Sequence, residues 1–438
     1  ADTNVVFGHQ FASIAGAGPI NGPIQAAIFG WLPVLLWILI GGVFFGAVQD
    51  FASMYASVKN KGRTIGYIIE EYIGKLGKKL FLLFCWLFCI LVVAAFADVV
   101  AGTFNGFVAD DAGTISKVAA NGAVATTSML FIVEAVALGC ILKYAKLNKW
   151  VNTAIAIVML VAAVALGLYF PMYLTRETWH ILIFIYILIA SVAPVTMLLQ
   201  PRDYLNSYLL IFMIAAAVVG VFIANPSCNL KAFTSFNVDG SYMFPILFVT
   251  IACGAVSGFH SLVSSGTTSK QLDKETDAKP IAYGGMLLEC VLAVLTLCAI
   301  GYAYKWNAAN PDSALVGATA IFGGGIAHMI DDIIPGSYTI LNSLLVLTYS
   351  AFCLTSLDTA TRLARFMFQE FWLEPGETAA DVKEGWKKVM VNPYFATILT
   401  VVLGILLGMN GYGKIWGLFG AANQLLAGIG LLAVASWL

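Results

Sequence analysis

Long apolar stretches alternate with short polar connections along nearly the whole chain. Most of these stretches are long enough to cross the hydrocarbon core of a bilayer as a helix, which takes about 20 residues. The pattern predicts an all-α, polytopic membrane protein with about twelve transmembrane helices. The predicted spans are Val6–Phe29, Trp31–Ser57, Leu80–Phe107, Ala123–Ile141, Trp150–Phe170, Trp179–Leu199, Tyr204–Ala224, Phe244–Thr267, Ile281–Tyr304, Ile340–Arg365, Tyr394–Leu407 and Ile415–Leu438. We interpret Gln200-Pro201-Arg202-Asp203 as a polar turn between the sixth and seventh spans.

Composition supports a membrane protein and argues against other classes. Hydrophobic residues make up 60% of the 438 positions, and only 11% are charged, whereas soluble domains carry about 25% charged residues. A soluble fold of this size cannot hide so much apolar surface. The formal net charge of −1 offers no basic surface for nucleic acid. We therefore expect the lipid bilayer and a small solute as partners, and no nucleic acid.

Basic residues are unevenly divided between alternate connections. Cytoplasmic connections of membrane proteins retain most Lys and Arg. If the connection after Trp31–Ser57 is cytoplasmic, all but five of the 23 basic residues fall on the cytoplasmic side. The five are Lys117, Arg176, Lys231, Lys305 and Lys414. We therefore expect the C-terminus of the chain inside and the long connection Trp306–Gly336 outside, as a lid, a gate or a plain loop.

Two of the spans, Val6–Phe29 and Phe244–Thr267, are poor continuous helices. The first contains the run Gly16–Pro19, where proline removes a backbone donor and glycine unwinds easily. The second is rich in glycine and hydroxyl residues, a composition that also suits close helix packing. By the charge count the two spans run in opposite directions. Two discontinuous helices of opposite direction are typical of an inverted repeat that binds a solute at mid-membrane.

The residues at the two interruptions are the candidate substrate site, because an interrupted helix exposes backbone groups that bind charge. His9 and His260 add an imidazole to each interruption, which can hold a proton near neutral pH or donate to a carboxylate. The alternative for each histidine is a neutral ring bonded to a backbone carbonyl. The candidate substrate-binding residues are His9, Gln10, Gly16, Ala17, Gly18, His260, Ser261, Ser264, Ser265 and Gly266.

Carboxylates within the spans are candidates for ion coupling, because an acid at membrane depth usually has a functional role such as carrying a proton. We select Asp50 and Asp98. Glu289 lies in the inner half of its span, as Asp50 does, whereas an inverted repeat places equivalent residues at opposite depths. Asp50 and Glu289 are therefore not repeat equivalents, and Glu289 is not selected.

The tenth span offers a second kind of coupling site. Oxygen ligands of the kind that hard cations prefer come from Thr355, Ser356, Asp358 and Thr359. The alternative is that these hydroxyls bond back to their own helix. We also expect Asp358 to pair with Arg362, one turn later. The sequence has no recognisable metal-ligand cluster and no nucleophile–base pair, so we expect no metal, no cofactor and no enzyme activity.

Several strings resemble the carbon starvation protein A (CstA) family. They are Val6-Phe7-Gly8-His9, Ala15-Gly16-Ala17-Gly18-Pro19, Gly46-Ala47-Val48-Gln49-Asp50-Phe51 and the run from Gly258 to Leu272. The resemblance covers essentially the whole chain, although members usually begin with one more hydrophobic segment and continue past this C-terminus. It implies a secondary transporter of the bacterial cytoplasmic membrane, related to the amino acid–polyamine–organocation superfamily.

The resemblance also implies a LeuT-like core of two inverted five-helix units within one transport domain over residues 1–438. The first unit would cover about 5–170 and the second about 244–438, with the helices of about 177–224 inserted between them. Family members are associated with uptake of peptides and with proton-driven uptake of pyruvate. The expected function is therefore import of a small carboxylate-bearing nutrient, coupled to protons or alternatively to sodium. A passive channel is the rival, and the oligomeric state is open.

Overall fold

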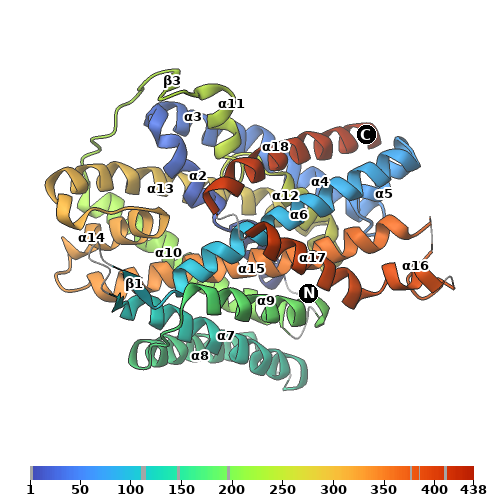
Figure 1. Ribbon diagram of the computed structural model, residues 1–438, viewed down its shortest axis with the longest axis horizontal. Coiled ribbons are helices and arrows are strands. Elements are labelled where there is room, and N and C mark those ends of the chain that lie inside the picture. Colours follow the sequence, from blue (N-terminus) through green and yellow to red (C-terminus); the bar gives the residue numbers. More distant parts are fainter. Residues whose placement is uncertain are drawn as a thin grey trace.

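The protein is mostly helical (Figure 1). A computed structural model describes residues 3–109, 115–145, 148–194, 198–374, 377–383, 385–408 and 412–438. Its helices are α1 (Thr3–Ile14), α2 (Gly18–Ala26), α3 (Trp31–Ile40), α4 (Ala47–Lys59), α5 (Ile65–Tyr72), α6 (Lys75–Phe104), α7 (Ala119–Tyr144), α8 (Lys149–Tyr169), α9 (Arg176–Val192), α10 (Leu199–Ala224), α11 (Met243–Thr250), α12 (Gly258–Gly266), α13 (Gly284–Ala309), α14 (Gly325–Asp331), α15 (Tyr338–Trp372), α16 (Gly385–Met390), α17 (Pro393–Gly408) and α18 (Tyr412–Trp437). The strands pair as two short antiparallel hairpins, β1 (Phe107–Ala109) with β2 (Ile115–Lys117) and β3 (Asn237–Val238) with β4 (Ser241–Tyr242).

The helices confirm a polytopic all-α membrane protein. Within the described residues, eight helices are long and apolar enough to cross a membrane. The other four predicted spans correspond to the shorter helices α9 and α17 and to two interrupted segments, α1–α2 and α11–α12. The total of twelve crossings stays a prediction, because an interrupted or shortened helix crosses a bilayer only when its open backbone is covered by protein.

Two spans contain a π-helical turn, at Gly41–Gly46 between α3 and α4 and at Lys279–Tyr283 before α13. Such turns are rare and occur mostly where a helix has a functional constraint. At Gly46 a Cβ atom would lie 2.1 Å from the carbonyl oxygen of Ala255. Glycine is therefore required at this position, where the second span touches the interruption of the eighth.

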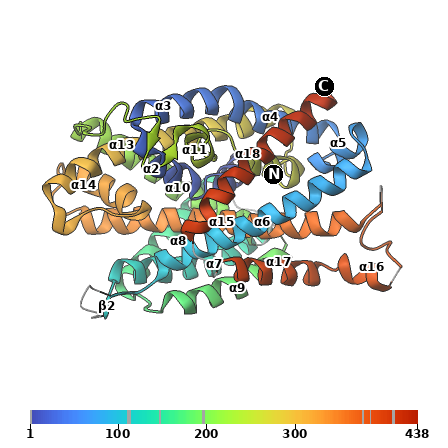
Figure 2. The ribbon, with the colours of Figure 1, turned by 45° about the horizontal axis from the view of Figure 1, so that its top comes forward.

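Two long helices, α6 and α15, pack against each other through the centre of the molecule. Figures 1 and 2 show α7 and α9 on one side of this pair, and α3, α11 and α13 on the other. Aromatic rings fill the space between α6, α12 and α18, where Phe88 contacts both Phe259 and Phe419. Large apolar side chains such as Phe44 and Phe222 are exposed on the outer faces, as expected for a surface that contacts lipid.

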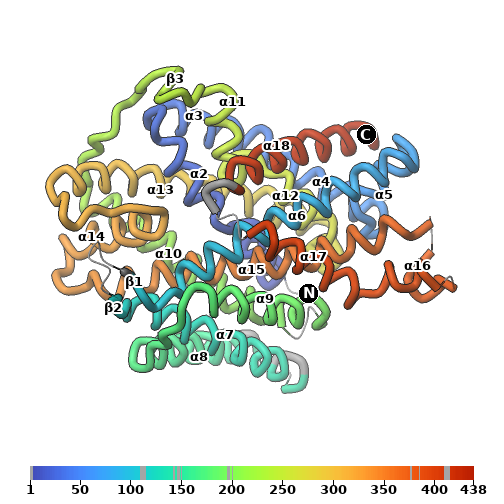
Figure 3. Tube along the Cα trace, viewed as in Figure 1, coloured from blue at the N-terminus to red at the C-terminus, as the bar shows by residue number. Residues whose placement is uncertain are grey.

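The connections between helices separate to the two ends of the long axis (Figure 3). One end carries α5, α16 and the C-terminus of the chain, and the other carries α14, β1 and β3. The first group belongs to the connections that the charge count assigns to the cytoplasm, and the second to those assigned to the outside. The two groups lie apart as this orientation requires, while the sidedness itself stays a prediction.

Candidate functional site

The first predicted span is interrupted, as its sequence predicts. The helix α1 ends at Ile14, and α2 begins at Gly18 with Pro19 in its first turn, a position where proline costs no hydrogen bond. A Cβ atom on Gly18 would lie 2.2 Å from Cβ of Cys253, so the eighth span packs directly against this interruption. Both interruptions therefore meet at one place inside the protein.

The eighth predicted span is also interrupted, between the end of α11 at Thr250 and the start of α12 at Gly258. Side chains from other helices bind the backbone groups that the interruption frees. The Gln49 side chain donates to the carbonyl of Ser257 at 2.8 Å, and Asn423 Oδ1 accepts from the backbone N–H of Phe259 at 2.9 Å. Side chains of α4 and α18 therefore bind two of the backbone groups at this interruption.

The predicted substrate-binding side chains on α12 are packed within the protein. Gln10 on α1 donates to the Ser264 hydroxyl at 2.9 Å. Ser261 and Ser265 donate to carbonyls of their own helix at 2.7 Å each, which is the local alternative for a serine in a helix. The other predicted substrate residues are buried too: His9, Gly16, Ala17, Gly18, His260 and Gly266. Their role in substrate binding stays a prediction.

His260 lies between two carboxylates, and we call Asp50, His260 and Glu289 the acid–histidine cluster. Nδ1 of His260 is 3.0 Å from Asp50 Oδ2, and Nε2 is 3.4 Å from Glu289 Oε2. All three side chains have no exposed surface. The helices α4, α12 and α13 each supply one member. Asp50 and His260 are among the candidate residues that the sequence indicates, whereas Glu289 is not, since only the fold brings α13 to His260.

A second buried group, the arginine cluster, consists of His9, Arg202, Asp203 and Asp358. His9 Nδ1 is 2.6 Å from Asp203 Oδ2, and Arg202 contacts Asp203 at 3.4 Å and also pairs with Asp358. Thr355 Oγ1 accepts from Arg202 Nη2 at 3.1 Å. Arg202 and Asp203 belong to the first turns of α10, so the interpretation of residues 200–203 as a turn between helices is wrong. A proline fits here because the first turn of a helix needs no proline N–H.

The expected pair of Asp358 with Arg362 is also wrong. Asp358 accepts from Tyr186 at 2.6 Å and pairs with Arg202 instead. Arg362 Nη2 donates to the carbonyl oxygens of Ala190 and Ala193, at 2.7 and 2.6 Å. These carbonyls lie at the C-terminal end of α9, where helical acceptors are unpaired and a cation is favourable. Arg362 therefore caps α9, and the i,i+4 spacing with Asp358 does not produce an ion pair.

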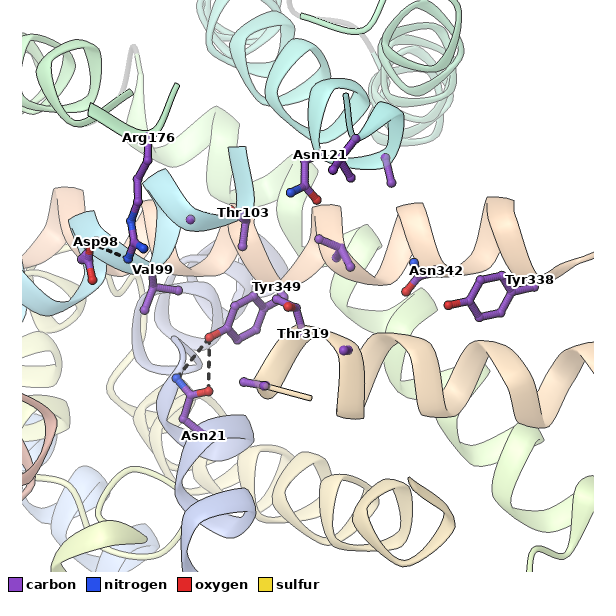
Figure 4. Close-up of a pocket in the computed structure, with 17 residues that line it drawn as sticks. Asn21, Asp98, Val99, Thr103, Asn121, Arg176, Thr319, Tyr338, Asn342 and Tyr349 are labelled. Carbon is purple, nitrogen blue, oxygen red and sulfur yellow. Dashed lines mark hydrogen bonds and ion pairs between the residues drawn. The ribbon is translucent and has the colours of Figure 1, made fainter. Parts of the chain in front are cut away.

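One cavity, which we call the vestibule, has a volume of about 610 Å³. It lies between α2, α6, α7, α15 and residues 317–320 (Figure 4). Its charged lining comes from Asp98 and Arg176, whose Oδ1 and Nη2 atoms are 2.7 Å apart. His180 Nε2 also lies 3.1 Å from Asp98 Oδ1. Its uncharged polar lining includes Asn21, Thr103, Asn121, Thr319, Tyr338, Asn342 and Tyr349.

Asn21 connects the vestibule to the first interruption. It lies in α2, one turn after the break, and donates to the Tyr349 hydroxyl of α15 at 3.1 Å (Figure 4). Among the residues selected from sequence, Asp98 lines the vestibule, whereas the others line none of it. Arg176 and His180 are not among the candidates from sequence: Arg176 precedes the apolar run Trp179–Leu199 and His180 lies at its start, where a charged or polar residue is ordinary. The sequence does offer one signal for Arg176, because it is one of only five basic residues in the connections that the charge count assigns to the outside.

Hydroxyls of α15 meet the end of α1. Ser356 donates to the carbonyl of Ser13 at 3.0 Å, and Thr359 Oγ1 is 3.3 Å from Ser13 Oγ. Within the described residues, no set of three or more His, Cys, Asp or Glu side chains is placed to hold a metal ion. The oxygens around Ser13 come from hydroxyls and from one backbone carbonyl, and oxygens of this type bind hard cations.

A stacked histidine stabilises the long connection of residues 306–336, part of which lines the vestibule. His328 on α14 lies between the rings of Trp306 and Tyr338, with centroids 3.9 and 4.2 Å away. Burial lowers the pKa of His328 from 6.5, although Asp331 and Asp332 act in the opposite direction. The described titratable groups around it are those two acids, Tyr302 and Tyr338.

We expect acid to loosen α14. Because the pKa of His328 is lowered in the folded state, the opened state binds the proton more readily, so the stabilisation present above pH 6.5 is lost as the pH falls below it. Hydrogen exchange of residues 325–331, corrected for the intrinsic rate, should show decreasing protection between about pH 8 and about pH 5. A His328→Phe variant keeps the stack and should show no such decrease. Equal pH dependence in both proteins would contradict this prediction.

Comparison with known proteins places the chain in a family. A family model described as carbon starvation protein CstA matches residues 1–321 and 303–438. The peptide transporter CstA of Bacillus subtilis (strain 168) is 33% identical over 494 residues, covering 99% of this chain and 76% of the relative. The peptide transporter CstA of Escherichia coli (strain K12) is 32% identical over 509 residues, covering 99% and 69%. The pyruvate/proton symporter BtsT of the same strain is 30% identical over 514 residues, covering 98% and 69%.

The match spans both interrupted segments, both buried ionic clusters and every helix that lines the vestibule. The resemblance seen in the sequence strings is thereby confirmed, and the relatives are named as transporters. This multi-pass membrane protein belongs to the carbon starvation protein CstA family.

Proposed function

We propose that the chain is a secondary transporter that imports a small carboxylate-bearing nutrient across a bacterial cytoplasmic membrane, driven by protons. The observation that carries the proposal is the vestibule, a cavity of about 610 Å³ that has charged and polar side chains in its lining and borders the interruption of the first span. Cavities beside interrupted helices are the usual solute sites of secondary transporters. The vestibule is lined by Val118, Arg176 and residues 317–320, which belong to connections that the charge count assigns to the outside, and this suits uptake.

Paired irregularities support an inverted repeat and alternating access. If residues of about 5–170 and 244–438 are equivalent units, the first helix of each is interrupted, and the second helix of each has a π turn. The third helices, α6 and α15, pack against each other at the centre. Rocking of one unit against the other would expose the vestibule to each side in turn.

The charged lining of the vestibule favours a substrate with a carboxylate. The Arg176 guanidinium presents a planar fork of donors that matches a carboxylate, and 45% of its side chain is exposed. Asp98 would accept the amine of a peptide. Relatives are named as peptide transporters and as a pyruvate/proton symporter, and both substrate classes carry a carboxylate.

Uptake into proteoliposomes tests the function. Labelled pyruvate and labelled dialanine would be offered with an imposed pH gradient, with an imposed sodium gradient, and with neither. Accumulation above the external concentration only under the pH gradient is the expected result. Flux that never exceeds equal concentrations on both sides would instead indicate a passive channel. Loss of accumulation when a protonophore is added would further support proton coupling.

Arg176→Ala should weaken substrate binding. Loss of a charge-assisted contact of about 1.5–3 kcal/mol raises the KM for pyruvate or dialanine by about 10- to 100-fold, with a smaller change in the maximal rate. Lys117→Ala is the matched control, because Lys117 is another basic residue of the same end and does not line the vestibule. An equal rise in KM for both variants would mean that Arg176 acts only through general electrostatic attraction.

Sodium coupling is the alternative, and the contacts at Ser13 favour it specifically. The Ser13 carbonyl and the hydroxyls of Ser356 and Thr359 converge at the end of α1. If sodium binds there, a Ser356→Ala/Thr359→Ala double variant should abolish the dependence of uptake on a sodium gradient. Under proton coupling, the same variant keeps its response to the pH gradient.

A further inference from the structure

The acid–histidine cluster joins three helices at the most constrained part of the fold. Asp50 lies on α4, just after the π turn Gly41–Gly46. His260 is in the first turn of α12, just after the interruption at residues 251–257. Glu289 lies on α13, which follows the second π turn. A change of charge in this cluster acts on three segments whose helices are already irregular.

The cluster holds more negative charge than its surroundings can balance. Two carboxylates face one imidazole, at 3.0 and 3.4 Å. Among the described residues, the ion pairs of Lys and Arg reach neither Asp50 nor Glu289. Both carboxyl oxygens of Glu289 and Oδ1 of Asp50 are buried and accept no hydrogen bond from the described residues. An ionised carboxylate in this condition costs several kcal/mol and takes up a proton instead.

The arginine cluster shows the contrast. Asp203 and Asp358 are both matched, by His9 and by Arg202, and Tyr186 donates a further hydrogen bond. Arg202 supplies this cluster with a permanent positive charge. The acid–histidine cluster has no permanent cation, so it reaches neutrality only when Asp50, His260 and Glu289 hold two protons between them, either one on His260 and one on an acid or one on each acid.

Among the residues that the structure describes, the rest of the surroundings adds no charge. The thiols of Cys253 and Cys290 are the other titratable groups near the two acids. The helix α1 presents the neutral Gln10 toward α12, and α18 presents Asn423. The extra proton therefore belongs to Asp50, His260 and Glu289 together.

We propose that the acid–histidine cluster binds the proton that drives transport, with Glu289 as the group that gains and loses it. This inference rests on the proposed function. In the state described here Glu289 is a neutral acid sealed between α12 and α13. Movement of α12 away from α13 would admit water, the O–H bond of Glu289 would break, and the proton would leave to water while the electron pair stays on the carboxylate. Asp50 and His260 position Glu289 and share the remaining charge.

Infrared spectroscopy of the purified protein tests proton binding without any substrate. A pH titration of the wild type should show the carbonyl stretching band of a buried protonated carboxylic acid, decreasing as the pH rises. Glu289→Gln should remove that band, and His260→Gln should shift it because it removes the ring beside Glu289. Glu134→Gln is the matched control, since Glu134 is a half-buried carboxylate on α7 outside the cluster, and it should leave the band in place.

A band that is unchanged in Glu289→Gln would overturn the assignment. If Glu289→Gln does not fold, Glu289→Asp replaces it, because this variant keeps a carboxylic acid whose band must move if the band belongs to position 289. An unmoved band in Glu289→Asp would equally overturn the proposal.

Transport measurements distinguish a wrong proton site from a wrong assignment of the transported substrate. In proteoliposomes with a pH gradient, Glu289→Gln should bring pyruvate or dialanine only to equal concentrations on both sides, while exchange of labelled for unlabelled substrate continues. Accumulation by Glu289→Gln equal to that of the wild type would overturn the proton site and leave the transporter intact. A wild type that accumulates neither probe, with a titrating band that depends on Glu289, would support the proton site and overturn the proposed import of these substrates.

Discussion

Replacing Gly258 by alanine should lower the stability of the folded protein by at least about 1–3 kcal/mol, the usual cost of forcing an extra carbon into a packed core. A Cβ atom at position 258 would lie 2.4 Å from Cβ of Leu426, 2.4 Å from the backbone nitrogen of Ala427 and 2.6 Å from the Asn423 carbonyl oxygen. Two of these neighbours are backbone atoms of α18, which cannot move without shifting the helix.

The same substitution should also weaken the cap of α12. Asn423 accepts from the N–H of Phe259 and contacts Ser257, so displacing α18 removes the side chain that binds the start of α12. Loss of a helix N-terminal acceptor costs about 1 kcal/mol. Both effects arise from the same displacement of α18 and contribute to a single measured loss of stability, so their separate costs are not simply summed.

Thermal unfolding in detergent, followed by size-exclusion chromatography, measures the effect of Gly258→Ala. Gly428→Ala is the matched control, because Gly428 lies on the same helix α18 and an added Cβ would meet no atom within 4 Å. The control should keep or slightly raise the unfolding temperature, since alanine favours helix over glycine. Similar unfolding temperatures for both variants would show that α12 does not need this close approach.

The interruptions of the helices could be predicted because they follow from local chemistry. Pro19 removes a donor and the neighbouring glycines allow unwinding, whatever the rest of the chain does. The histidines at the interruptions could be found for the same reason, as polar residues in apolar runs. Their partners could not, because Asp203 is 194 positions from His9 along the chain and Asp50 is 210 from His260.

Pairing across such distances depends on helix packing, which spacing rules do not describe. The i,i+4 rule applied to Asp358 and Arg362 considers one helix alone. In the structure α9 and α10 approach α15, so Arg202 reaches Asp358 and the end of α9 attracts Arg362. The vestibule depends on packing as well, since its lining comes from α2, α6, α7 and α15. The sequence predicts a polar site near the interruptions but not which side chains surround the cavity.

Arg202→Met should destabilise the protein by about 3–5 kcal/mol, the cost of removing one partner from a buried ion pair. Only 2% of the Arg202 side chain is exposed, and Asp203 and Asp358 have no exposed side-chain surface. Without the guanidinium, His9 still pairs with Asp203, but from the described part of the chain Asp358 keeps only the hydrogen bond from Tyr186. The variant should therefore unfold at a lower temperature and give less folded protein in the membrane.

The physical origin of that loss is tested by a second substitution. In Arg202→Met/Asp358→Leu the unmatched carboxylate is gone, and apolar side chains of similar volume often replace a buried pair without loss, so stability should recover in large part. Arg202→Lys should remain less stable than the double variant. An ammonium cannot contact Asp203, Thr355 and Asp358 at once, as the guanidinium fork does. A double variant as unstable as Arg202→Met would mean that the packing of the arginine stem, and not the unmatched charge of Asp358, holds α10 against α15.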